Sequence, residues 1–146
     1  MMFEPHNRDE LRVAYSEAWR KHLAGLPLTS LEAMIAGVVA LHPEYQAMIH
    51  DARVAVAFEP IARQTAQNPF LHLGLHMAVR EQVSIDRPPG VRALHGLLQA
   101  RCGDVHGGEH ILVDALAETL WEAQRTGRPP DEGYYLSLVR RSLDLT

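Results

Sequence analysis

The stretch DVHGGEHILVDALAETLWEAQR, residues 104–125, decides how the rest of the chain is interpreted. It predicts one long helix, because its apolar residues recur at the period that places them on one helix face. At this period the side chains of His106, Glu109 and His110 lie on the same side of the helix as the apolar face, within about a third of the helix circumference. A buried polar group without a partner costs about 1–3 kcal/mol. We therefore expect these three side chains to have partners inside the protein.

The segment FLHLGLHMAVREQVSI, residues 70–85, predicts a helix that offers such partners. It is apolar almost all the way round, which is typical of a helix buried on most sides. His72 and His76 are four residues apart and so lie one above the other on one face. His106 and His110 repeat that spacing. Two facing helices of this kind can surround one ion with four imidazoles, and Glu109 adds a carboxylate.

Capping and breaking signals divide the remaining chain into further helices. The first predicted helix runs from Asp9, its N-cap, to Gly25. Thr29 and Glu32 form a capping-box motif, which marks the start of the second helix. The predicted helices after the first cover residues 31–41, 43–58, 70–85, 91–101, 104–125 and 132–145. Residues 61–67 are ambiguous between a helical turn and a loop, and no stretch alternates as a strand would. The predicted fold is an all-α, single-domain bundle of about six or seven helices over residues 1–146.

Composition narrows the class of protein. A chain of 146 residues that is 47% hydrophobic can bury a sizeable core in one domain. Its net charge of −4 argues against a nucleic-acid or anionic-membrane binder. The polar start MMFEPHNRDELR predicts no signal peptide, and no apolar run approaches the roughly 20 residues of a membrane span. Cys102 is the only cysteine, which suits a reducing cytoplasm.

The histidine pattern leads to a metal-site hypothesis. Imidazole with carboxylate suits zinc, iron or nickel, so we predict a divalent transition metal bound by His72, His76, His106, Glu109 and His110. If the site is catalytic, Glu109 is either a ligand or the base that acts on a metal-bound water. The alternative is a metal-free interaction or regulatory module whose histidines form a buried polar network. In that case the amphipathic first and last helices could form the face of a homo-oligomer.

Three shorter patterns leave further alternatives. Gly107-Gly108 either allows a ligand or a neighbouring helix to approach closely, or shows that the helix begins only at Glu109. His106-x-x-Glu109-His110 matches the reversed zinc-peptidase motif, but the short remainder of the chain offers little room for its further acidic ligand. Its order also differs from the Glu-x-x-His of carboxylate-bridged bundles. His42-Pro43 is interpreted as a helix boundary, with a ligand role as the alternative.

Several blocks of the sequence, taken together, resemble those of a known family. They are LRVAYSEAWRK, PLTSLEAMI, HPEY, NPFLHLGLHMAVREQ with its DRPPG loop, and GDVHGGEH with the later LWEAQRTGRPPDE. Over nearly its whole length the chain resembles the uncharacterised bacterial family catalogued as domain of unknown function 1841. The resemblance implies no activity. It implies that His72, His76, His106, Glu109 and His110 belong to the family pattern.

Overall fold

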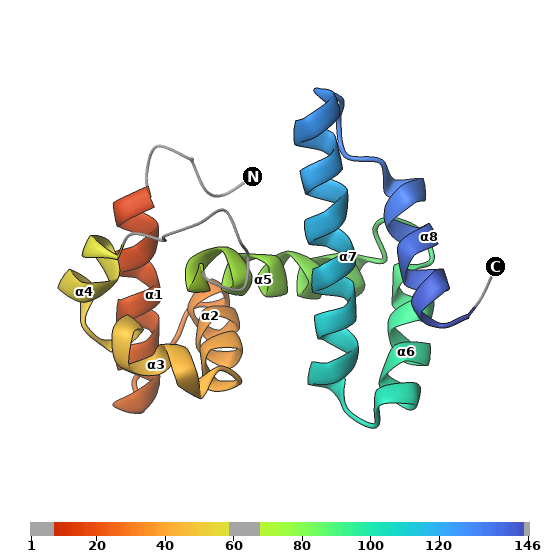
Figure 1. The fold of residues 1–146 in the computed structure, drawn as a ribbon. Helices are drawn as coiled ribbons and strands as arrows, with labels where there is room; N and C mark the ends of the chain where they lie inside the picture. The colour runs from red at the N-terminus through yellow and green to blue at the C-terminus, as the bar shows by residue number, and fades with distance from the viewer. Residues whose placement is uncertain (1–7, 59–67, 145–146) are drawn as a thin grey trace. The chain divides into compact units, whose positions relative to one another are not determined.

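The computed structural model describes residues 8–58 and 68–144, which form eight α-helices and no strand (Figure 1). In chain order the helices are α1 (Arg8–Leu23), α2 (Ser30–Ala40), α3 (Pro43–His50), α4 (Ala52–Ala57), α5 (Pro69–Ile85), α6 (Val91–Cys102), α7 (Val105–Thr126) and α8 (Glu132–Ser142). The all-α prediction is confirmed. The ambiguous segment 61–67 lies outside the described residues.

The single helix predicted over residues 43–58 is divided into α3 and α4. Asp51 separates them with extended backbone angles, φ −102° and ψ 112°. Its side chain accepts a hydrogen bond of 2.9 Å from the backbone N–H of Arg53 and so caps α4. A short acidic side chain competes in this way with the helical backbone, which explains why the helix is interrupted there. This division accounts for one helix more than predicted.

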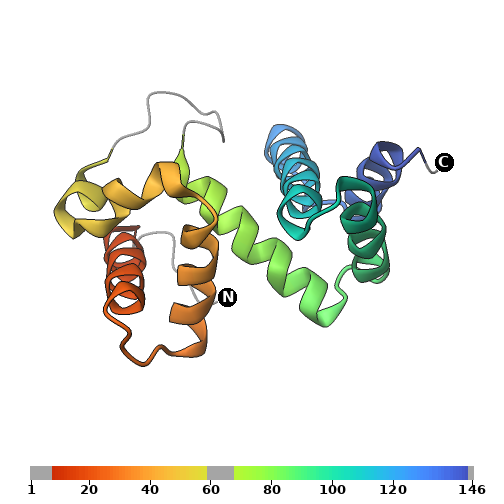
Figure 2. The same ribbon diagram turned by 90° about the horizontal axis from the view of Figure 1, so that it is seen from below.

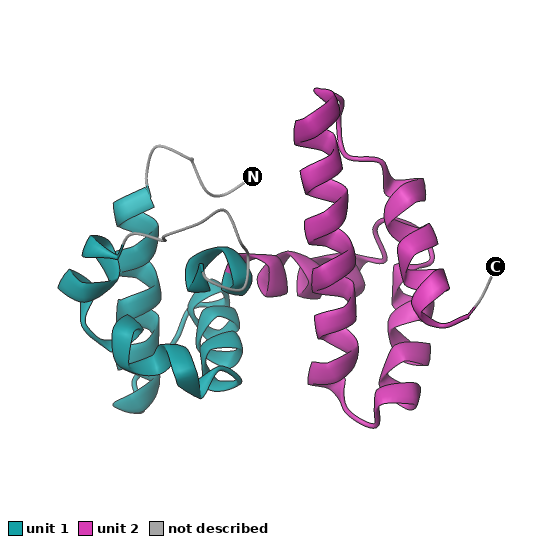
Figure 3. Ribbon diagram, viewed as in Figure 1, with its two compact units in different colours: residues 1–73 teal, residues 74–146 magenta. Residues whose placement is uncertain are grey.

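The chain divides into two compact units, residues 1–73 and 74–146 (Figure 3). The division falls within α5, a continuous helix. The single domain predicted from chain length stays a prediction. Among the described residues, no helix has the length and apolar character needed to cross a membrane.

In the first unit, α1 packs against α2, α3 and α4 (Figure 2). Its core contains apolar residues from several helices: Tyr15, Ala18, Trp19, Ile35, Ala36, Val38, Val39, Ile49, Ala55, Phe70 and Leu73. The predicted capping box is present, with both hydrogen bonds between Thr29 and Glu32. The buried Arg12 donates hydrogen bonds to three carbonyls at the end of α4, those of Ala55, Val56 and Phe58. These bonds satisfy carbonyl groups that the short helix leaves without helical partners.

In the second unit, α6, α7 and α8 pack against one another, and Figures 1 and 2 show them side by side. The later turns of α5 contribute Leu75 and Val79 to this core. Asp104 caps α7 by accepting a hydrogen bond from the N–H of Gly107, so the helix begins before its two glycines. A Cβ atom at Gly108 would lie only 3.1 Å from the backbone nitrogen of Gln99 in α6. The close approach of a neighbouring helix therefore explains this glycine.

Candidate metal centre

His42 and His72 form a pair in the first unit. His42 stands at the junction of α2 and α3, is 2% exposed, and precedes Pro43 at the start of α3. Its Nδ1 lies 2.8 Å from the carbonyl oxygen of Val38. A carbonyl can only accept, so Nδ1 carries a proton, and in the neutral ring Nε2 holds the lone pair. That Nε2 lies 3.1 Å from Nε2 of His72.

The ring of Tyr45 also packs against His42. The two rings stack with centroids 5.4 Å apart and planes 6° apart. The boundary interpretation of His42-Pro43 is therefore correct, because α2 ends and α3 begins there. The same junction places the His42 imidazole beside His72, which is the contact that the ligand alternative requires.

Glu109 anchors a cluster of buried polar groups in the second unit. Its side chain is 3% exposed and that of His76 is 0% exposed. Oε1 of Glu109 accepts a 2.6 Å hydrogen bond from Nδ1 of His76, and Nε of Arg80 donates to Oε1 and Oε2 at 3.0 and 3.2 Å. Burial opposes ionisation of this carboxyl, but the hydrogen bond from His76 and the charge of Arg80 outweigh this effect and lower the pKa of Glu109. Glu109 is thus held as a carboxylate with two donors.

His106 and His110 lie beside His76 on the first turns of α7, as their spacing predicts. The ring centroids of His106 and His110 are 4.1 Å apart. His110 meets the His76 ring edge to face at 4.7 Å, and His106 lies parallel to it at 5.4 Å. Both are partly buried, whereas His76 is fully buried. Glu109 is therefore buried, and His106 and His110 are partly buried, on the face of α7 that the sequence pattern predicts to point inward.

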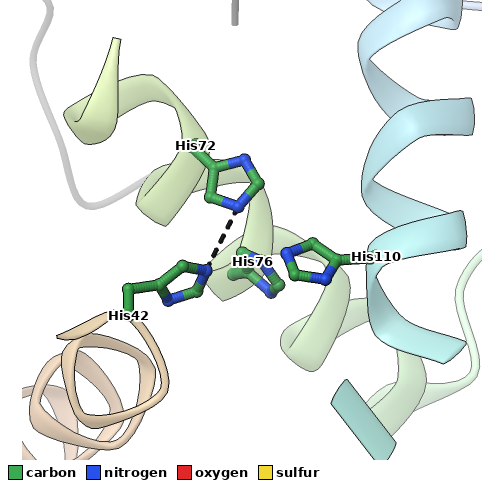
Figure 4. A group of neighbouring side chains, drawn as sticks. All are labelled: His42, His72, His76 and His110. Atoms are coloured by element: carbon green, nitrogen blue, oxygen red, sulfur yellow. Dashed lines mark hydrogen bonds between the residues drawn. The ribbon is translucent and has the colours of Figure 1, made fainter. Parts of the chain in front are cut away.

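Figure 4 shows four histidines that each offer a ring nitrogen as a possible metal ligand: His42 and His72 of the first unit, and His76 and His110 of the second. Three of these belong to the predicted ligand set, and His42 is the addition. His106 and Glu109 are outside this group, although both contact His76. Imidazole nitrogens are donors that suit a transition metal.

Other side chains of a type that can bind metals have different surroundings. Glu44 and Glu81 are exposed. His95 is buried in α6, and its Nε2 has no hydrogen-bond partner in the part of the chain that the structure describes. Burial lowers the pKa of His95, against an opposing effect of the Glu109 charge. Cys102 is an exposed free thiol.

The model of the family described as Domain of unknown function (DUF1841) matches residues 7–141, and the chain belongs to this family. The resemblance stated from the sequence blocks is thereby confirmed. Neither the comparison with curated proteins nor that with solved structures found a match.

Proposed function

We propose that this protein binds a divalent transition-metal ion, zinc, iron or nickel, through His42, His72, His76 and His110. One observation carries the proposal. Both fully buried histidines of the group have Nδ1 bonded to an oxygen acceptor, the Val38 carbonyl for His42 and the Glu109 carboxylate for His76. Metal-binding histidines in proteins are held in this way, because the bond at one nitrogen leaves the lone pair of the other for the ion.

The spacing of His42 and His72 also supports a shared ion. Two ligand nitrogens that each lie about 2.0–2.1 Å from a metal, at angles between octahedral and tetrahedral values, are separated by roughly 2.8–3.4 Å. The observed separation of the two Nε2 atoms is 3.1 Å. The distance between these two nitrogens is therefore compatible with a shared ion. His72 and His76 follow one another by one turn of α5, so both can face the same ion.

A metal-free polar network is the second candidate, and the same distance favours it. A separation of 3.1 Å suits an N–H···N hydrogen bond, with His72 donating to the lone pair of His42. In this case the histidines only stabilise the folded structure, and the protein acts through a surface that binds a partner. The two candidates differ in their response to a chelator.

The test is metal analysis of protein purified without an affinity tag or chelator, together with thermal unfolding before and after chelation. The proposal expects near-stoichiometric zinc, iron or nickel, and a lower Tm once the ion is removed. An ion at 100 times its Kd stabilises the folded state by about 2.7 kcal/mol. For a chain of this size that corresponds to roughly 5–10 °C in Tm.

Single alanine variants of the four histidines complete the test. Each should reduce the bound metal, and the Tm of each should respond little to further chelator. His50→Ala is the matched control, because His50 is an exposed histidine at the end of α3. It should retain the wild-type metal content. If the wild-type protein neither carries nor rebinds an ion, and its Tm is indifferent to chelator, the metal proposal fails and the network remains.

A further inference from the structure

We infer that Glu109 is a positioning residue of the proposed metal centre, held by Arg80 so that it selects the nitrogen with which His76 binds the ion. The inference rests on the proposed function and deepens it. It assigns to Glu109 neither of the roles that the sequence left open, ligand or general base. It also gives a role to Arg80 of α5.

The carboxylate of Glu109 is already engaged on both oxygens. Oε1 accepts from His76 Nδ1 at 2.6 Å and from Arg80 Nε at 3.0 Å, and Oε2 accepts from Arg80 Nε at 3.2 Å. An ion bound at a remaining lone pair of either oxygen would lie next to the positive guanidinium of Arg80. Moving this guanidinium aside would be costly, because the charge of the buried Glu109 would lose its partner. Arg80 therefore keeps Glu109 beside the imidazole and away from the ion.

The bond between Glu109 and His76 fixes a choice that an isolated imidazole leaves open. A neutral imidazole carries its proton on either nitrogen, and the partner of one nitrogen decides which. A carboxylate next to Nδ1 can only accept, so the proton resides on Nδ1 and the lone pair on Nε2. The His76 ring cannot readily turn, because it is fully buried with His110 edge to face at 4.7 Å. His76 is thus set to bind through Nε2 before any ion arrives.

The test is Glu109→Gln, which keeps the size of the side chain but removes its charge and gives it an amide that can donate. Zinc affinity is measured by competition with a chromophoric chelator, and the His76 tautomer by 15N NMR of the metal-free protein labelled at histidine. The matched control is Glu118→Gln on the same helix, an exposed residue whose carboxylate lies 3.4 Å from the hydroxyl of Tyr134. We expect Glu109→Gln to weaken zinc binding by about 10- to 100-fold, the usual effect of losing such a partner.

The tautomer separates positioning from a merely structural role. In the wild type His76 should carry its proton on Nδ1, and in Glu109→Gln a substantial fraction should move to Nε2. The control should leave both affinity and tautomer unchanged. If Nδ1 of His76 carries no proton in the wild-type protein, the inference is overturned even if the variant does not fold. It is also overturned if Glu109→Gln binds zinc with wild-type affinity. Failure of the proposed function is a different result, because the wild type would then bind no zinc at all.

Discussion

Alanine at Gly96 and at Gly108 should change stability in opposite directions. Both glycines lie within helices, where alanine is favoured over glycine by about 1 kcal/mol. A Cβ atom at Gly96 would meet nothing within 4 Å, so Gly96→Ala should gain most of that energy. At Gly108 the added atom would lie 3.1 Å from the nitrogen of Gln99 and 3.2 Å from the carbonyl carbon of Leu98. These are backbone atoms of α6, which cannot move aside as a flexible side chain can.

Overpacking of this kind costs about 1–3 kcal/mol. After the helical gain of about 1 kcal/mol, Gly108→Ala should destabilise by roughly 0–2 kcal/mol. The two variants should therefore differ by about 1–3 kcal/mol in the free energy of unfolding. Urea denaturation followed by circular dichroism measures this difference through the transition midpoints, since the change in exposed surface is nearly the same for both.

The same pair of variants tests how α6 supports the histidine cluster. Gly108 lies between His106 and His110, so moving the first turns of α7 away from α6 should displace both imidazoles and weaken metal binding. Gly96→Ala should leave metal binding unchanged. If Gly108→Ala proves as stabilising as Gly96→Ala, the close approach of the two helices does not constrain this position, and the reasoning is refuted.

Three further substitutions test other parts of the fold. Arg12→Met should lower the free energy of unfolding by about 3 kcal/mol in urea denaturation, because it leaves buried carbonyls at the end of α4 without a charged donor. Thr29→Ala should cost about 1 kcal/mol in the same assay, since it removes half of a capping box. Burial lowers the pKa of His95 in the folded state. The stability that the neutral His95 contributes is therefore complete above the ordinary histidine pKa of 6.5, and it is lost as the pH falls toward the lower pKa of the folded state. His95→Phe should therefore flatten the loss of Tm below pH 6.5, and an unchanged pH profile would contradict this.

Local signals in the sequence were sufficient for most helix ends. Thr29 with Glu32 and Asp131 cap the helices that they predict, because a cap depends on residues within one turn. The break at Asp51 was missed, since the apolar pattern on either side continues through it. An aspartate inside an expected helix is the signal that could have located this break.

The candidate site was predictable only where it follows helix periodicity. His76 and His110 have spacing partners on their own helices, and the structure brings their rings together. The sequence offers His42 only as an alternative ligand, because it lies at a helix junction, where no helical period relates it to another histidine. Helix periodicity also does not predict the role of Glu109. Periodicity shows that its side chain points inward but not that Arg80, on another helix, meets it there.

The two models of the histidines differ in how they satisfy the lone pairs of buried rings. His42 and His76 come from dissimilar places, a helix junction and a helix interior, yet both have Nδ1 bonded to an oxygen. Each therefore presents an Nε2 lone pair, which must be matched in a buried site. A network needs a separate donor for each lone pair, and His72 can supply the one for His42. The proposed ion would instead accept both lone pairs, together with those of His72 and His110, so the common arrangement of the two buried rings is the one that metal-binding histidines have.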